Sequence, residues 1–185
     1  MAELDCFADT PHENIDNCPN EEISGGLSTK LHYIPVAFVE TYSLPTDKTL
    51  GGRLKLAANS IVPKTGKGWK SIDIMVEENE LKAPLVGNKG NKKLTSQVDF
   101  YIPGFKTKSI GFVDAYKNVP TIYAIPDANG VFWVVGTMLH GGFIDTSEAT
   151  TGKKMEDNSG VPVTVKSNAK LYALTGELTI TPDTP

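Results

Sequence analysis

Apolar and polar residues alternate in the middle of the chain in a pattern that predicts β-strands with one face exposed to water. In segments 71–77 and 94–102, apolar side chains recur at every second position or nearly so, with polar residues between them. A period of two places such residues on one face of a strand. Pro103–Gly104 ends the second segment. The apolar set is Ile72, Ile74, Val76, Leu94, Val98, Phe100 and Ile102.

The segment 121–138 predicts a β-hairpin. Two apolar runs, Thr121–Pro126 and Val131–Met138, flank the sequence Asp-Ala-Asn-Gly at 127–130. Asn and Gly tolerate the positive φ angles that tight turns require. Residues 131–135 are apolar at every position. We therefore expect this strand to be covered on both faces, by a helix or by a second sheet.

Three other regions predict further strands. Lys30–Val39 is apolar-rich but contains Pro35, which predicts a place near a sheet edge or a bulge. Residues 43–68 fit either a helical face or a strand, and by composition they end in a loop, PKTGKG. Two strands joined across Asn168 are expected near the C-terminus. Their apolar positions are Val161, Val163 and Val165, then Tyr172, Leu174, Leu178 and Ile180.

One short helix is predicted over Ser109–Asn118, with Ser109 as its N-cap and Pro120 after its end. Together the segments give seven to nine strands and one or two short helices. The expected fold class is mainly β, an antiparallel β-sandwich or half-open barrel with one short flanking α-helix. The expected organisation is an extended N-terminal arm over 1–29, a β domain over 30–180 and a C-terminal tail over 181–185.

Charge is distributed unevenly along the 185 residues. The net charge is −4, yet residues 1–22 carry seven acids and no Lys or Arg, whereas residues 23–118 have a net charge of +6. The acidic end is either a solvated tail or a surface that docks on the basic middle, within or between copies. The chain has a single arginine, Arg53, which argues against sequence-specific reading of nucleic acids.

Targeting signals are not evident in the sequence. No stretch approaches the roughly 18 to 20 apolar residues of a membrane span. The acidic N-terminus lacks the basic and apolar layout of a signal peptide. We expect a soluble protein made in a cytoplasm, in which Cys6 and Cys18 stay reduced. Their spacing with His12 and His32 matches no zinc-binding pattern.

Catalytic motifs are incomplete wherever they begin. His140-Gly141-Gly142 resembles an esterase oxyanion loop, but the chain has no Gly-x-Ser-x-Gly elbow, and Gly26–Lys30 lacks the last glycine. These glycines are therefore interpreted as a bend or bulge. Glu77, Glu78 and Glu80 do not pair on one strand face as a glycosidase requires. We expect no catalytic, cofactor-binding or metal-binding residues, and no cofactor.

Phosphate and calcium motifs also fail on spacing. Gly66-Lys67 and Gly152-Lys153 lack the remaining residues of a P-loop. Asp127-x-Asn129 begins like a calcium loop, but its twelfth position is Met138, so a turn is expected instead. The lysines gather in predicted loops, where they are exposed to solvent or pair with acids of a neighbouring copy. They are Lys64, Lys67, Lys70, Lys89, Lys92, Lys93, Lys106 and Lys108.

An ordered set of short motifs from the middle of the chain onward resembles a known family. The motifs are Leu81–Gly87, Lys93–Phe100, Ile102-Pro-Gly104, Ile110-Gly-Phe112, Lys117-Asn-Val-Pro120, Ile125-Pro-Asp127, Asn129-Gly130, Val135-Gly136, Thr151-Gly-Lys153, Asp157–Gly160 and Leu171-Tyr172. Their order is similar to that in the major tail, or tail tube, proteins of tailed bacteriophages that infect Bacteroidetes. The resemblance covers about residues 50–180, and none of these motifs is catalytic.

The resemblance implies a virion structural protein and not an enzyme. Tail tube proteins share a β-sandwich or barrel with a flanking helix. Six copies form a ring, and the rings stack into a tube that conducts the phage DNA on ejection. The implied partners are other copies of the chain, the tape measure, terminator and baseplate proteins, and genomic DNA in the lumen without sequence-specific contacts. The implied location is the virion tail, and segments 43–68 and 84–93 are long enough to bridge rings.

Two other classes of function remain open. A tail terminator, a connector ring or a capsid decoration protein would share the structural role without forming a tube. A carbohydrate-binding β-sandwich would need exposed aromatic rings, for which Trp69 and Trp133 are the candidates, although Trp133 lies in a strand expected to be buried. An enzyme is the least supported class, because the chain offers no nucleophile or acid–base set.

Overall fold

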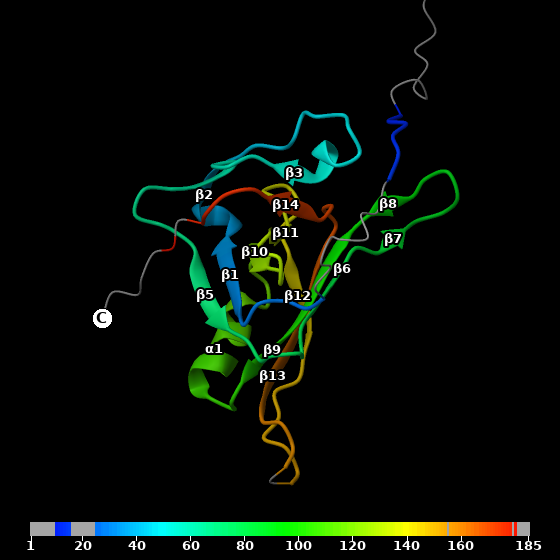
Figure 1. The fold of residues 1–185 in the computed structure, drawn as a ribbon. Helices are drawn as coiled ribbons and strands as arrows, with labels where there is room; N and C mark the ends of the chain where they lie inside the picture. The colour runs from blue at the N-terminus through cyan, green and yellow to red at the C-terminus, as the bar shows by residue number, and fades with distance from the viewer. Residues whose placement is uncertain (1–9, 16–24, 155, 179, 181–185) are drawn as a thin grey trace, which may run out of the picture.

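Two β-sheets packed face to face form the body of the protein in a computed structural model that describes residues 10–15, 25–154, 156–178 and 180 (Figure 1). Cys6, Cys18 and the expected tail 181–185 lie outside the described residues, as does most of the expected arm. The larger sheet has six strands, all antiparallel except for the β14–β3 pair. In sheet order the strands are β3 (Lys55–Leu56), β14 (Tyr172–Leu174), β11 (Phe132–Val135), β10 (Thr121–Pro126), β1 (Lys30–Pro35) and β5 (Lys70–Asp73).

The smaller sheet has four strands and is antiparallel throughout. Its two central strands pair over eight residues, from Gly160 opposite Pro103 to Ser167 opposite Ser96. Val161, Val163 and Val165 face inward from one of them, as the alternation predicts. In sheet order the strands are β12 (Phe143–Ser147), β13 (Gly160–Ser167), β9 (Ser96–Pro103) and β6 (Glu80–Lys82).

Short elements complete the fold. One strand pair, β2 (Val39–Tyr42) with β4 (Ile61–Pro63), lies on the larger sheet, and a second, β7 (Leu85–Val86) with β8 (Lys93–Leu94), projects from the body (Figure 1). The 3-10 helices η1 and η2 span Val36–Phe38 and Gly52–Leu54, and helix α1 spans Thr107–Tyr116. The described residues thus contain 14 strands, more than the seven to nine expected, because several have only two or three residues and give no readable period.

Two apolar clusters fill the two faces of the six-stranded sheet. One lies between the sheets and joins residues such as Tyr123 and Val135 to Val98, Phe100 and Val163. The other lies on the opposite face, under β2, β4 and the buried Trp69. Neighbouring residues of β11 contribute to different clusters, Trp133 to the first and Val134 to the second. The expected cover on both faces is confirmed for Phe132–Val135, whereas Val131 is exposed. A mainly β, sandwich-like fold with one flanking helix is also confirmed.

The turn between β10 and β11 forms where the sequence predicts it. The Asp127 carboxylate accepts hydrogen bonds from the backbone N–H groups of Asn129 and Val131 at 2.8 and 2.9 Å. Gly130 takes the positive φ, 79°, that this turn requires. Asp127 therefore closes the turn that the sequence predicts. The segment just before β1 is also part of the fold, because Leu27 forms a β-bridge with Asp127 and packs on the apolar cluster between the sheets.

Pro35 lies near a sheet edge, as expected, because β1 is next to the edge strand β5. It ends β1, which lies between β10 and β5. The next N–H, that of Val36, donates to Pro120 O on the β10 side at 2.9 Å. The Pro35 nitrogen therefore faces the β5 side, where pairing has already ended at Tyr33. A proline is tolerated there because no ladder hydrogen bond is lost.

Val76 does not share the buried face with Ile74, contrary to the alternation. Its side chain is exposed, whereas Ile74 is buried. The chain leaves β5 at Asp73 and crosses between the sheets. The N–H of Ile74 donates to Thr29 O, and the next N–H, of Met75, donates to Tyr101 O. The crossing interrupts the period of two.

Helix α1 begins before its predicted N-cap. Thr107 is its first residue, Lys106 occupies the N-cap position without a side-chain cap, and Ser109 is buried within the first turn. The aromatic side chains explain its placement, because Phe112 and Tyr116 stack on each other and contact the ring of Tyr33 edge-on.

Two other expectations changed in detail. Within 43–68 the strand alternative is correct at β3 and β4, and the helical alternative fails except for the short η2. Near the C-terminus, Tyr172 and Leu174 are buried, but Ile180 is exposed. The alternation of buried and exposed residues ends there because β14 ends at Leu174 and Gly176 takes a φ of 125°.

Candidate assembly surface

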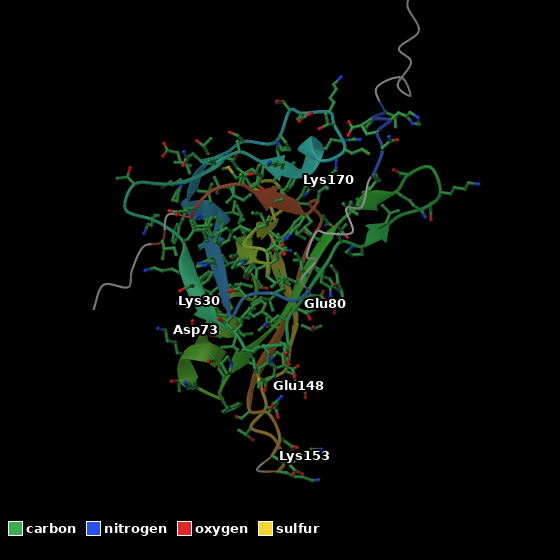
Figure 2. The ribbon with its side chains drawn as sticks, in the orientation of Figure 1. Lys30, Asp73, Glu80, Glu148, Lys153 and Lys170 are labelled. Atoms are coloured by element: carbon green, nitrogen blue, oxygen red, sulfur yellow. The ribbon has the colours of Figure 1, made fainter. Side chains whose placement is uncertain are left out.

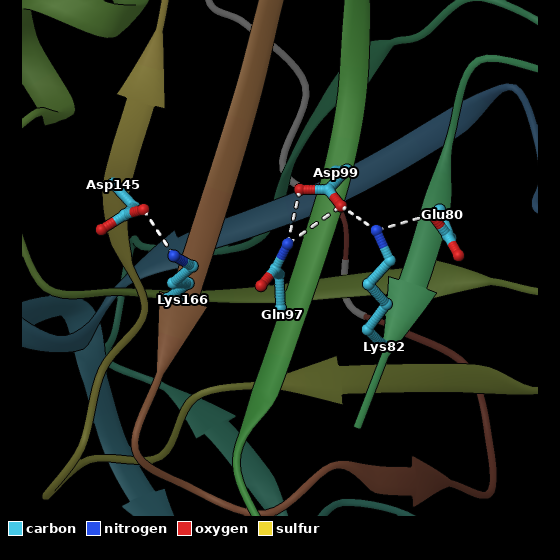
Figure 3. Close-up of polar contacts among 6 residues, drawn as sticks. All are labelled: Glu80, Lys82, Gln97, Asp99, Asp145 and Lys166. Carbon is cyan, nitrogen blue, oxygen red and sulfur yellow. Dashed lines mark hydrogen bonds and ion pairs between the residues drawn. The ribbon is translucent and has the colours of Figure 1, made fainter. Parts of the chain in front are cut away.

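The outer face of the four-stranded sheet is polar and carries a group of ion-paired side chains (Figure 3). Along β9, Val98 and Phe100 point into the core, and Gln97 and Asp99 point outward. Along β6, Leu81 packs on the core between Glu80 and Lys82. The alternation that buries one face thus gathers the charged residues of separate strands on the other.

Ion pairs link the charged side chains across this face. Lys82 Nζ lies 2.9 Å from Asp99 Oδ2 and 2.7 Å from Glu80 Oε2 (Figure 3). Lys166 Nζ lies 2.7 Å from Asp145 Oδ2. Gln97 Nε2 donates to both Asp99 oxygens at 3.0 Å. Both lysines in this group thus have a carboxylate partner in the same chain.

The hydrogen bonds set the protonation of the central residues. Those to Glu80 and then Asp99 raise the pKa of Lys82 to about 12. Burial pushes the pKa of Asp99 upward, but hydrogen bonds from Lys82, Thr164 and Gln97 outweigh it and hold that pKa below its usual value. Both groups therefore stay charged near neutral pH.

Neither edge strand of this sheet pairs with a further strand within the described residues, although Gly142, just before β12, exchanges two backbone hydrogen bonds with Thr121. β12 pairs only with β13, and β6 pairs only with β9. Their side chains are accessible: Phe143 is 45% exposed, and the side chains of Lys82 and Asp145 are 43% and 42% exposed. Unpaired edge strands present free N–H and C=O groups that can accept another strand.

An apolar groove lies beside the start of β12. Its volume is about 640 Å³, and it runs between the base of the β7–β8 hairpin and the loop 138–143. Val86, Met138, Leu139 and Phe143 are its large apolar residues, each exposed by more than a third, with Leu139 84% exposed. Such a concentration of exposed apolar side chains marks an interaction surface.

The histidines do not form a site among the described residues. His32 is buried in the larger sheet, and its Nδ1 has no hydrogen-bond partner. His140 is exposed, and its backbone closes a turn: its N–H donates to Thr137 Oγ1, and its carbonyl accepts from Ser167 Oγ. The bend expected at Gly141-Gly142 lies instead at residues 138–140, Gly142 forms a β-bridge with Thr121, and β11 ends at Val135 and not at Met138. No cluster of three metal-ligating side chains occurs in the part of the chain that the structure describes.

Seven of the eight lysines expected in exposed loops are exposed, whereas Lys70 lies in β5 and is half-buried. Lys64 Nζ donates to Ala37 O, and Lys67 lies over the Phe38 ring. Lys89, Lys92 and Lys93 are exposed along the β7–β8 hairpin, which replaces most of the loop expected at 84–93. Figure 2 shows Glu148 and Lys153 on the β12–β13 connection at another extremity.

The other residues that the sequence analysis considered as catalytic or binding groups either support the fold or are exposed side chains. Asp157 accepts hydrogen bonds from the N–H groups of Lys153 and Lys154, so Gly152-Lys153 belongs to a turn. Glu77 and Glu78 are exposed, as is Glu80 in its ion pair with Lys82. Trp69 is buried, and Trp133 is half-buried with its Nε1 donating to Asp127. Neither tryptophan therefore presents the open ring that a carbohydrate site needs.

The ion-paired row was not predicted from the sequence. Its residues are far apart along the chain, and only the β6–β9 and β9–β13 registers bring Lys82, Gln97 and Lys166 to one level. The sequence shows charged residues at the outward positions of each alternating strand. It does not show which strands pair, or in what register.

Comparison with protein-family models, curated proteins and solved structures finds no match to this chain. Among the described residues, no helix has the length and apolar character needed to cross a bilayer.

Proposed function

We propose that this protein is a virion structural protein, the tail tube subunit of a bacteriophage, which assembles into stacked hexameric rings. The observation that carries the proposal is the four-stranded sheet, which has one face in the core, one polar face and two edge strands that pair with no further strand within the described residues. The ordered motifs that resemble tail tube proteins of Bacteroidetes phages support the same function.

The polar face suits the lining of a DNA conduit. Copies joined side by side would extend the sheet around a lumen, with the apolar face toward the core. Phosphate binding depends on free cations. Lys82 and Lys166 are each bound to a carboxylate on this face, so a passing duplex meets neutralised charge. The proposed mechanism is shape and electrostatics, without catalytic turnover.

The projecting segments suit contacts between rings. The β7–β8 hairpin carries three exposed lysines, and the segment 43–60 lies with it in the upper part of the fold in Figure 1. The proposed partners are further copies, the tape measure, terminator and baseplate proteins, and DNA in transit. The proposed location is the virion tail, after synthesis in the host cytoplasm.

Negative-stain electron microscopy of the concentrated protein, beside sedimentation velocity, tests this function. We expect hollow rings and stacked tubes. Single rings that never stack would favour a terminator or connector, and association only with capsids would favour a decoration protein. A chain that stays monomeric in the presence of tail initiation proteins would contradict the proposal.

A further inference from the structure

We propose that Asn129 is a site of spontaneous deamidation, and that the hydrogen bonds of the Asp127 turn control the rate of this reaction. In the folded protein the turn keeps the reaction slow, and opening of the turn allows it to proceed. The inference concerns the chemical lifetime of the folded chain and does not depend on the proposed function.

The sequence contains the reactive pair once. Asn129 is followed by Gly130, and no other asparagine in the chain precedes a glycine. Asparagine is one of the thermolabile residues of proteins. A following glycine has no side chain to obstruct its own backbone nitrogen, and its backbone is the least restricted in φ and ψ. Both residues are exposed at the β10–β11 turn, so water reaches the site.

The reaction needs water and no other reagent. The backbone nitrogen of Gly130 loses its proton and bonds to Cγ of Asn129, and the side-chain amide nitrogen leaves as ammonia. The product is a cyclic imide. Water then opens the imide at either of its carbonyl carbons, which gives aspartate or isoaspartate at position 129.

The turn keeps the attacking nitrogen in a hydrogen bond. The Gly130 N–H donates to the backbone oxygen of Asp127 at 3.1 Å, and the Asp127 N–H donates to Val131 O at 2.9 Å. The Gly130 bond must break before that nitrogen can lose its proton and turn toward the Asn129 side chain. The folded-state rate therefore depends on how often the turn opens.

The Asp127 side chain holds the turn closed. Its Oδ1 accepts from the N–H groups of Asn129 and Val131 at 2.8 and 2.9 Å, and its Oδ2 accepts from Trp133 Nε1 at 2.9 Å. Opening the turn disturbs these bonds together, and hydrogen bonds to a charged acceptor are stronger than neutral ones. Asp127 is thus a protecting residue for Asn129.

Deamidation would in turn weaken this part of the fold. Either product places a second carboxylate beside Asp127, and like charges at close range repel. Isoaspartate also adds a methylene group to the main chain between the strands of the hairpin. The segment before β1 is affected as well, because the Ala128 N–H donates to Gly26 O and Leu27 bridges to Asp127.

Peptide mapping by mass spectrometry tests the proposal on the full chain during incubation in mildly alkaline buffer. We expect Asp127→Ala to deamidate at Asn129 at least about fivefold faster than the wild type, because turn opening becomes easier by about that factor when these bonds are lost. Trp133→Phe removes one of the bonds and should give a smaller increase. Asn158, which is exposed and followed by Ser159, is the internal control and should convert at the same rate in all variants.

Two further measurements separate local opening from global unfolding. Val98→Ala lowers the stability of the core in the other sheet without altering the turn, and it should deamidate at Asn129 at the wild-type rate. In concentrated urea the turn is absent, so the wild type and Asp127→Ala should react equally fast, and faster than the folded wild type. Circular dichroism confirms which variants are folded in buffer.

The outcomes decide the proposal as follows. Equal rates at Asn129 in folded wild type and folded Asp127→Ala would overturn the protecting role of Asp127. A Val98→Ala variant as fast as Asp127→Ala would show that global unfolding, and not the turn, controls the reaction. A wild type that reacts no faster in urea than in buffer would show that the fold gives no protection.

Discussion

The Trp133 indole Nε1 donates a hydrogen bond to Oδ2 of Asp127 at 2.9 Å, which ties β11 to the turn that precedes it. The other Asp127 oxygen accepts the two backbone bonds of the turn. Although burial acts to raise the pKa of Asp127, the bonds from Trp133, Val131 and Asn129 lower it overall. Asp127→Ala should lower the free energy of unfolding by about 1–3 kcal/mol, because it leaves these donors unpaired.

Urea denaturation checks this expectation. Asp127→Asn keeps one acceptor oxygen and should lose less stability than Asp127→Ala. Because the folded pKa of Asp127 is lowered, its contribution is present above the unfolded pKa, about 3.9, and is lost as pH falls below it. Equal stability of the wild type and Asp127→Ala would contradict the role of the turn.

His32 should make the fold sensitive to mild acid. Burial, and then the charge of Lys30, lowers its pKa below the ordinary value. The ring lies edge-on to Phe132, and its Nδ1 has no partner. A lowered folded pKa means that stability is complete above about pH 6.5, the unfolded value, and falls as pH drops below it.

Urea midpoints measured between about pH 8 and pH 5, which brackets the ordinary histidine pKa, test this effect. The wild type should lose stability across this range, and His32→Gln should show a smaller change. His140→Gln, at an exposed histidine, is the matched control and should follow the wild type. A His32→Gln variant as acid-sensitive as the wild type would disprove the assignment.

Two glycines should respond oppositely to alanine. A Cβ at Gly160 would meet the Ile102 carbonyl oxygen and the Tyr101 ring, so Gly160→Ala should cost about 2 kcal/mol or more. A Cβ at Gly111, within α1, meets nothing within 4 Å, so Gly111→Ala should stabilise by up to about 1 kcal/mol. Thermal unfolding measures both, and a stabilised Gly160→Ala would show that the β9–β13 approach is less close than described.

The basic hairpin should affect assembly through charge. Changing Lys89, Lys92 and Lys93 to Glu should alter association at low salt, and the difference should shrink as salt screens the charges. Light scattering at several salt concentrations provides the measurement. The same three positions changed to Gln separate loss of positive charge from gain of negative charge. Unchanged association at low salt would exclude a role for these lysines.

The acidic N-terminal residues provide a further test of assembly. Deleting residues 2–22 should weaken contacts between copies and leave the β core folded, because the described core clusters use none of these residues. Sedimentation velocity and circular dichroism report the two effects separately. Tubes that form equally well without these residues would make the segment dispensable.

Local patterns predicted much of the fold. The alternation along β9 and β13, and the Asp-Ala-Asn-Gly turn, each encode their structure within a few residues. The crossing at Ile74 and Met75 could not be predicted, because its partners, Thr29 and Tyr101, are distant in sequence. The ion-paired row of the candidate assembly surface was not predicted for the same reason, because the alignment of its side chains depends on the strand register.

The crossing between the sheets has a mechanical consequence. Consecutive amides, those of Ile74 and Met75, are anchored in different layers. Thr121 of β10 and Gly142, just before β12, exchange two backbone hydrogen bonds, which form a second link between the sheets. With two such links the layers cannot shear past each other without breaking backbone hydrogen bonds. A force that pulls on one sheet is therefore transmitted to the other sheet. A tube wall built from such subunits would resist internal pressure through both sheets together.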